Sequence, residues 1–240
     1  MYKCRLVARG YQQKGLIFED LYSPVAKLNT LRILLAISVN FDWVVYQMDV
    51  CSAFLHGEIK ENIYMYLPEN CNLPVGKVCK LKKAIYGLKR APKYWYEKFE
   101  NFMFSQNFVK SENDHCLYFK ISSNSKMYVL IYVDDLIITG SDTKQIDEFK
   151  CEMKRNFKMK DFGPISYYLG ISISQNVNEN VVTLDQSNYL ENVLKKFDMF
   201  DCKSISTPMD NNFDYESLIK GKSENADVEN KCRKLIGCIM

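Results

Sequence analysis

The stretch MYVLIYVDDLIIT, residues 127–139, decides the fold of this chain. Two apolar and largely β-branched runs flank an adjacent pair of carboxylates, Asp134 and Asp135. Charged side chains cannot lie inside a buried strand ladder, so the pair predicts a tight turn between two buried strands, with both acids at the turn. Aspartate also suits turns on purely structural grounds, so the pair alone does not establish a function.

The sequence around this hairpin alternates between helical and strand patterns. Apolar spacing and capping residues predict helices over 28–40, 94–108, 142–157 and 187–197, the second beginning near Pro92. Strands are predicted over 43–48, 116–121, 167–174 and 181–184. This order favours an α+β fold with antiparallel strands and helices packed on one face of the sheet.

Asp49 ends the apolar strand that begins at Trp43. If this strand neighbours the hairpin, Asp49, Asp134 and Asp135 converge at one sheet edge. Converging carboxylates repel one another unless hard divalent cations neutralise them, and Mg²⁺ is the natural candidate. Two ions in such a cluster can activate a hydroxyl and stabilise the leaving oxygens of a nucleotidyl transfer.

Composition further limits the class of protein to which the chain can belong. The chain has 240 residues, of which 47% are hydrophobic and 25% are charged, and this is enough for one or two folded domains. Nine cysteines without a Cys-x-x-Cys pair and only two histidines argue against a disulfide scaffold and a His-rich zinc site, and favour a reducing setting. The longest apolar stretch, 31–46, is interrupted by polar residues, so no membrane span is expected.

Positive charge is concentrated between Lys77 and Lys98, although the whole chain carries only +3. This stretch holds eight lysines and arginines against one acid, which gives a local charge of +7. Aromatic residues are interleaved with the charges, as suits a template strand whose phosphates need cations and whose bases can stack. The alternative is an ordinary solvated helix face.

Seven short motifs, read in order, resemble the reverse transcriptase of copia-type LTR retrotransposons over about 200 residues. They lie at Arg5–Gly10, Tyr22–Ala26, Gln47–Val50 with Ala53–Gly57, Leu81–Lys89, Tyr132–Leu136, Tyr168–Ile171 and Ser206–Met209. The resemblance implies right-hand polymerase fingers and palm, with an antiparallel palm sheet and a partial thumb. It also implies an RNA-directed DNA polymerase that extends a primer with dNTPs by two-metal catalysis.

The resemblance assigns roles to individual residues. Asp49, Asp134 and Asp135 hold two Mg²⁺ ions, with Mn²⁺ as an alternative. Lys160 is a general acid near the leaving group, with Lys158 as the rival for that role. The implied nucleotide-binding residues are Arg5, Phe54, Tyr86 and Gly87, with Phe54 as a steric gate against the 2′-hydroxyl. The implied template and primer contacts are Lys89, Arg90, Pro92, Tyr132, Leu169 and Gly170.

Each of these roles has a plainer alternative. Arg5 on a strand can be a solvated charge, and Phe54 after an apolar strand can be core. The run from Tyr168 to Gly170 is ordinary for a buried strand.

The resemblance also divides the chain. Residues 1–202 are expected to be fingers and palm with the start of the thumb, truncated at the N-terminus. The polar segment 203–233 is expected to be a flexible linker, and 234–240 the start of a connection region. The expected partners are an RNA or DNA template with primer and dNTPs, within a polyprotein carrying protease, integrase and ribonuclease H.

No membrane partner is expected, and the expected location is a cytoplasmic virus-like particle. The competing hypothesis is an inactive truncated remnant that only binds nucleic acid. A third is that the shortened chain does not fold stably.

Overall fold

The computed structural model describes residues 4–13, 15, 21–68, 76–176, 179–206 and 226–239. It combines α-helices with antiparallel sheets, which confirms the mixed fold class. The chain divides into two compact units: Met1–Ser166 with Ser174–Thr183, and Tyr167–Ile173 with Leu184–Met240. Residues 1–202, expected to hold fingers and palm with the start of the thumb, thus contribute to both units.

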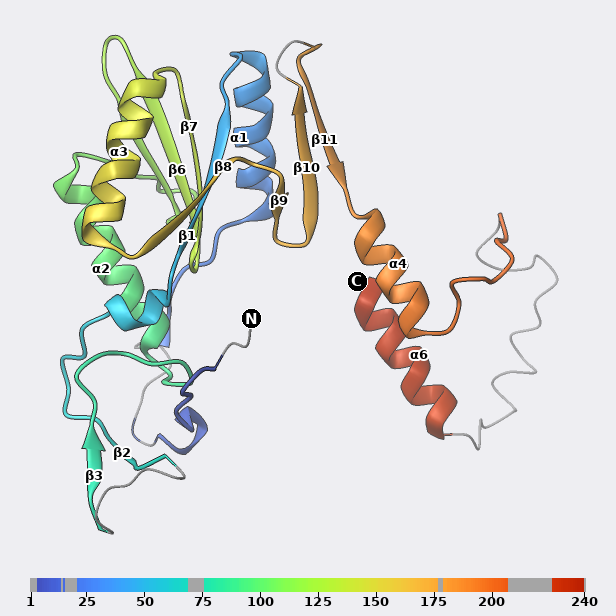
Figure 1. Ribbon diagram of the computed structural model, residues 1–240, viewed down its shortest axis with the longest axis horizontal. Helices are drawn as coiled ribbons and strands as arrows, with labels where there is room; N and C mark the ends of the chain where they lie inside the picture. Colours follow the sequence, from blue (N-terminus) through green and yellow to red (C-terminus); the bar gives the residue numbers. More distant parts are fainter. Residues whose placement is uncertain are drawn as a thin grey trace. The chain divides into compact units, whose positions relative to one another are not determined.

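A six-stranded antiparallel sheet forms the framework of the first unit (Figure 1). Its strand order is β4-β5-β6-β7-β1-β8. In chain order the strands are β1 (Val45–Val50), β4 (Val109–Lys110), β5 (Leu117–Ile121), β6 (Lys126–Tyr132), β7 (Asp135–Gly140) and β8 (Met159–Pro164). The predicted hairpin is confirmed, because β6 and β7 pair from Met127↔Gly140 to Tyr132↔Asp135 around the turn Val133-Asp134.

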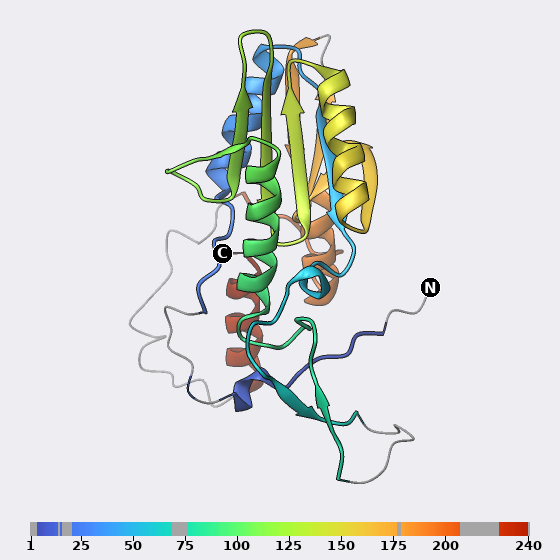
Figure 2. The same cartoon turned by 90° about the vertical axis from the view of Figure 1, so that its left-hand side faces the viewer.

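Three helices cover this sheet: α1 (Leu28–Asn40), α2 (Ala91–Ser105) and α3 (Thr143–Asn156). Pro92 lies in the first turn of α2, where its missing N–H costs no hydrogen bond. The Asp142 side chain caps α3 by accepting from the backbone N–H groups of Lys144 and Gln145. Figures 1 and 2 show α2 and α3 on one face of the sheet and α1 on the other. The expectation of helices on one face was therefore wrong, because β7 is buried from Leu136 to Gly140 on both of its faces.

Aromatic side chains fill the core between the sheet and α2. Trp95 and Phe99 of α2 pack on each other at 5.8 Å, and Phe99 meets Tyr118 of β5 edge-on at 5.6 Å. Phe157, which follows α3, packs edge-on against both Trp95 and Phe102. These rings make α2 a rigid support for the sheet behind the predicted acids.

A smaller subregion of the first unit gathers elements that the sequence did not predict. It contains the short helices η1 (Gly10–Gln12) and η3 (Ala53–His56) and the two-stranded sheet of β2 (Tyr64–Tyr66) and β3 (Val78–Lys80). Residues 4–9, which precede η1, cross it beside Tyr86, where Val7 forms a parallel bridge and the Ala8 N–H donates to the Tyr86 carbonyl at 2.7 Å. Gly87 has φ +89°, and a Cβ there would lie 2.0 Å from the Ala8 carbonyl oxygen. Only glycine permits this crossing.

The second unit contains β9 (Tyr167–Tyr168), the first residues of β10 (Ile171–Asn176) and two helices, α4 (Ser187–Lys196) and α6 (Ala226–Ile239). The strand predicted over 167–174 is instead a hairpin, because Leu169 and Gly170 turn the chain with φ values of 49° and 83°. β11 (Val181–Asp185) confirms the predicted strand, and together these strands form a sheet in the order β11-β10-β9.

The predicted linker over 203–233 was wrong for its last part, where α6 begins at Ala226 and runs through the expected boundary at 233. An apolar stripe on α6 explains the helix: Leu235, Ile236 and Ile239 recur at helical spacing. Residues 207–225 lie outside the described part. The Tyr189 hydroxyl of α4 donates to the Cys238 carbonyl of α6 at 2.6 Å. Among the described helices, none is both long and apolar enough to cross a membrane.

Candidate active site

The turn between β6 and β7 carries the two adjacent acids. Val133 occupies the left-handed region with φ 59°, which β-branched residues rarely adopt. Two backbone carbonyls of the turn are held from outside the hairpin. The Trp95 indole N–H donates to the Val133 carbonyl at 2.5 Å, and the Val50 N–H donates to the Asp134 carbonyl at 2.8 Å.

Asp49 lies beside this turn because β1 pairs with β7. The register sets Asp49 directly opposite Asp135. On the other side of β1, Lys160 of β8 is paired with Asp49. Directly paired residues of antiparallel strands point to the same face, so the three side chains form a row across β7, β1 and β8. We call Asp135, Asp49 and Lys160, with the adjoining Asp134, the carboxylate row.

The charges of the carboxylate row interact. The pKa of Asp135 is raised to about 6, first by burial and then by the negative charges of Asp134 and Asp49. A hydrogen bond from Gln47 to the Asp135 carboxylate works in the opposite direction. A carboxylate whose proton affinity is raised by two neighbouring acids belongs to a site where a cation would relieve repulsion.

The donor chemistry of the row suits a hard divalent ion, because every acidic ligand offers oxygen. Within the described ranges, no three His, Cys, Asp or Glu side chains are gathered closely enough to form a ready metal cluster. The strand register nevertheless brings the three acids to adjoining positions on the sheet. The residues present therefore fit Mg²⁺ in charge and ligand type.

A second cluster, of Arg5, Phe54 and Tyr86, lies next to the acids. The Arg5 guanidinium lies over the Tyr86 ring at 5.1 Å, and the rings of Phe54 and Tyr86 are 4.5 Å apart. The pKa of the Tyr86 hydroxyl is raised by burial and by the charges of Asp134 and Asp49, and Arg5 opposes this rise. The structure thus brings together three of the four residues expected at the nucleotide. The fourth, Gly87, packs against the Ala8 backbone.

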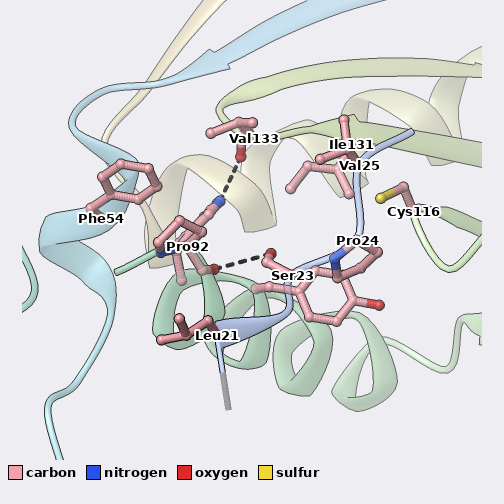
Figure 3. Close-up of a pocket in the computed structure, with 11 residues that line it drawn as sticks. Leu21, Ser23, Pro24, Val25, Phe54, Pro92, Cys116, Ile131 and Val133 are labelled. Atoms are coloured by element: carbon pink, nitrogen blue, oxygen red, sulfur yellow. Dashed lines mark hydrogen bonds between the residues drawn. The ribbon is translucent and has the colours of Figure 1, made fainter. Parts of the chain in front are cut away.

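An apolar cavity of about 250 Å³ lies below Val133 (Figure 3). Its lining includes Phe54, Pro92, Ile131 and Val133, together with Leu21, Ser23, Pro24 and Val25. Pro92, expected at the template, is thus a wall of this cavity, and its carbonyl accepts from the Ser23 hydroxyl at 3.4 Å.

The basic stretch from Lys77 to Lys98 is partly neutralised by two acids outside it. Glu61 accepts from both Arg90 and the Tyr94 hydroxyl, and Glu58 accepts from Lys98 at 2.9 Å. The pKa of Tyr94 is raised to about 12, by burial first and then by Glu61. The two glutamates bring two negative charges and Lys60, which pairs with Glu97, brings one positive charge, so the local charge falls from +7 to +6. The Lys89 amine is also engaged, because it donates to the Gln13 carbonyl at 2.9 Å.

The expected primer contacts fall in different places. Tyr132 is paired with Asp135 and shares its face of the sheet, close to the carboxylate row. Leu169 and Gly170 form the turn between β9 and β10 in the second unit. Leu169 is exposed, whereas the preceding Tyr168 is buried.

Several residues that shape the site were missed by the sequence reading. Gln47 and Glu61 each contact a residue of the site and were assigned no role. Trp95 was expected among the aromatic residues that stack on template bases, but it is 2% exposed and donates to the turn instead. The place of Gln47 in the site could have been predicted, because Gln47 lies two residues before Asp49 and so points to the same face of the strand. The place of Glu61 could not have been predicted, because Glu61 reaches Arg90 only in the folded chain.

Comparison with known proteins places the chain in a family. The family model described as "Reverse transcriptase (RNA-dependent DNA polymerase)" matches residues 1–211. The Retrovirus-related Pol polyprotein from transposon TNT 1-94 of Nicotiana tabacum is 43% identical over 212 residues, covering 87% of this chain and 16% of that protein. The corresponding polyprotein from transposon RE1 of Arabidopsis thaliana is 37% identical over 212 residues, covering 87% and 14%.

A shorter relative, the putative transposon Ty5-1 protein of Saccharomyces cerevisiae, is 34% identical over 167 residues, covering 68% of this chain and 54% of that protein. No solved structure gives a significant match. This chain spans about a sixth of the length of the two plant polyproteins. The match of the reverse transcriptase model over residues 1–211, together with these relatives, shows that the chain belongs to the reverse transcriptase family, as the reverse transcriptase domain of a copia-type retrotransposon Pol polyprotein.

Proposed function

We propose that this chain is an RNA-directed DNA polymerase that extends a primer on an RNA or DNA template with dNTPs. Asp49, Asp134 and Asp135 would hold two Mg²⁺ ions, with Mn²⁺ as an alternative. The observation that carries the proposal is the carboxylate row, in which the register pairs Asp49 with Asp135, and in which burial and the charges of Asp134 and Asp49 raise the pKa of Asp135. The family membership supports the same chemistry.

The fold supports a right-hand interpretation of the two units. The six-stranded sheet backed by α2 and α3 would be the palm, because it carries the acids. The segment 4–13 with β2 and β3 would be the fingers, and α4 the start of the thumb. In this interpretation Gly87 lets the fingers segment cross the palm closely enough to bring Arg5 to Tyr86.

Each residue near the acids has a defined task in this function. When bound, Mg²⁺ supplies activation of the primer hydroxyl and stabilisation of the leaving pyrophosphate oxygens. Arg5 would bind phosphate oxygens through its planar guanidinium. Phe54, packed on Tyr86, would occlude a 2′-hydroxyl and so favour deoxynucleotides. Lys160, paired with Asp49, would protonate the leaving group.

The nucleic acid would contact a wider set of residues. Tyr132 shares the face of Asp135 and would contact the primer end. Arg90 and Lys89, with Pro92 beside them, would face the template. Leu169 and Gly170 would contact the primer. We place the reaction in a cytoplasmic particle, within a polyprotein that also supplies protease, integrase and ribonuclease H.

Primer extension tests the proposal. The chain is incubated with an RNA template, a DNA primer, dNTPs and Mg²⁺, beside the variants Asp134→Asn and Asp135→Asn. Asp147→Asn is the matched control, because Asp147 is exposed on α3 and its described contact is a distant ion pair with Lys150 at 3.9 Å. We expect extension by the parent and the control, and loss of at least about 100-fold in both site variants.

The inactive-remnant hypothesis predicts a different pattern. In that case the parent shifts a labelled primer-template in a binding assay, loses this binding at high salt and yet never extends the primer. Extension that survives in Asp134→Asn and Asp135→Asn would refute the assignment of the acids.

A further inference from the structure

We propose that Trp95 is a positioning residue for catalysis: its indole N–H holds the Val133 carbonyl and thereby sets the backbone that presents Asp134 and Asp135. The inference rests on the proposed function, because the turn that Trp95 holds is part of the proposed metal site. Trp95 itself lies in α2, behind the sheet, and does not contact the reacting groups.

The turn needs an external support because its conformation is unfavourable. Val133 is held in the left-handed region although it is β-branched. Such a residue keeps this backbone only where its surroundings enforce it. The hydrogen bonds from Trp95 to Val133 and from Val50 to Asp134 are both contributed from outside the β6–β7 hairpin. Of the two, the bond from Trp95 acts on the strained residue itself.

The donor is fixed in place by its own neighbours. Trp95 is 2% exposed, and its ring packs against Phe157 at 5.3 Å, Phe99 at 5.8 Å and His56 at 5.9 Å. An indole N–H can donate but cannot accept, so its direction selects a carbonyl. Any buried indole N–H needs an acceptor, but a tryptophan that only filled the core could use any carbonyl within reach. Here the acceptor belongs to the one residue of the turn that has positive φ.

The surroundings of the Val133 carbonyl offer little to replace the indole. Val133 lies on the wall of the 250 Å³ cavity, where the labelled side chains around it, Val25, Ile131 and Phe54, are apolar (Figure 3). Figure 3 draws the bond accepted by the Val133 carbonyl as a dashed line. Loss of the N–H would therefore leave the carbonyl next to carbon atoms, and the turn would relax away from its present shape.

The test uses Trp95→Phe, which keeps an aromatic ring but removes the N–H. The matched control is Phe99→Leu, which removes ring volume from the same aromatic cluster and has no hydrogen bond to the turn. Two quantities are measured on the full chain: kcat with KM for dNTP in primer extension, and the rise in melting temperature on titration with Mg²⁺. The second readout needs no activity, because an ion that binds the folded state stabilises it by mass action.

A positioning role predicts that Trp95→Phe lowers kcat about ten-fold, leaves KM for dNTP within about two-fold, and raises the half-saturating Mg²⁺ concentration several-fold. Phe99→Leu should melt at a lower temperature yet keep kcat and the Mg²⁺ response of the parent. A purely structural role predicts that the two variants behave alike in both readouts, and that result would overturn the proposal. So would a Trp95→Phe variant that matches the parent.

A second variant keeps the test decisive if Trp95→Phe folds poorly. Val133→Gly removes the left-handed strain, so the double variant Trp95→Phe with Val133→Gly should regain part of the lost kcat and Mg²⁺ response. If the double variant recovers neither, or also fails to fold, the indole acts only on core stability and the proposal fails.

Failure of the proposed function would appear in primer extension by the parent and by Asp134→Asn. It would show as absent extension by the parent, or as extension by Asp134→Asn, whatever Trp95→Phe does. A parent without extension but with a Mg²⁺-induced rise in melting temperature that Trp95→Phe loses would leave the positioning role intact.

Discussion

Replacing Asp135 by asparagine should stabilise the metal-free protein at neutral pH while abolishing its proposed activity. The pKa of Asp135 rises from 3.8 to about 6 on folding, so the ionised form is unfavourable in the folded state. Asparagine removes that charge and keeps an oxygen that can accept from Gln47. The burial of this carboxylate, together with its repulsion by Asp134 and Asp49, thus destabilises the metal-free fold.

The magnitude follows from the shift in pKa. A rise of about two units corresponds to about 3 kcal/mol at full strength. Asp135 is only half-buried, so solvent screening reduces this, and we expect a gain of about 1–2 kcal/mol in the free energy of unfolding. For a chain of this size, that is roughly 3–6 °C in melting temperature.

The pH dependence has a definite sign. The folded state binds the Asp135 proton more tightly than the unfolded state, so the parent loses stability as the pH rises from 3.8 to about 6. Asp135→Asn lacks this loss. Its advantage over the parent should therefore be full above pH 6 and should vanish as the pH falls toward 3.8.

The assay is thermal or urea unfolding in EDTA between pH 4 and pH 8, with Asp147→Asn as control. Added Mg²⁺ should then stabilise the parent more than the variant and reduce the difference between them. An Asp135→Asn protein that is less stable than the parent at pH 7.5, or whose advantage does not change with pH, would refute the conclusion that burial and charge repulsion disfavour the ionised Asp135.

Three other perturbations follow from the site. Gly87→Ala should lower the melting temperature and speed proteolysis after Arg5 and Arg9, because the alanine Cβ would lie 2.0 Å from the Ala8 carbonyl oxygen. An unchanged rate of proteolysis would argue against the close contact between Gly87 and Ala8. Phe54→Ala should lower the preference for dNTP over rNTP by at least about ten-fold in extension assays, and an unchanged ratio would mean that Phe54 is only core. Glu61→Gln should tighten template binding, because it frees Arg90 from its ion pair. Arg90→Met should weaken template binding and reduce the slope of the logarithm of the binding constant against the logarithm of the salt concentration by about one. Unchanged binding in both variants would show that this face does not contact the template.

The sequence predicted the elements whose pattern is local. The apolar runs on both sides of Asp134 and Asp135 required strands and a turn, and the structure has both. The position of Asp49 could not be predicted from local pattern alone. Asp49 reaches Asp135 only because β1 pairs with β7, which lies more than eighty residues further along the chain. The resemblance to a family supplied that pairing where periodicity could not.

The errors have identifiable physical causes. Helices lie on both faces of the sheet, because the continuous apolar run of β7 needs cover on both sides. The polar composition after Lys203 concealed the amphipathic stripe of α6. The basic stretch appeared stronger than it is, since Glu58 and Glu61 join it only on folding.

The position of β1 between β7 and β8 has a consequence for how the nascent chain acquires its site. β5, β6 and β7 are joined by short turns, so they can pair early, whereas β1 must wait for partners about 90 to 115 residues further along. We therefore expect Asp134 and Asp135 to be in place before Asp49 joins them. Pulsed hydrogen exchange during refolding should protect β6 and β7 before Val45–Val50, and simultaneous protection would contradict this order. Until β1 pairs with β7, the chain has its hairpin but lacks the third acid of the proposed metal site.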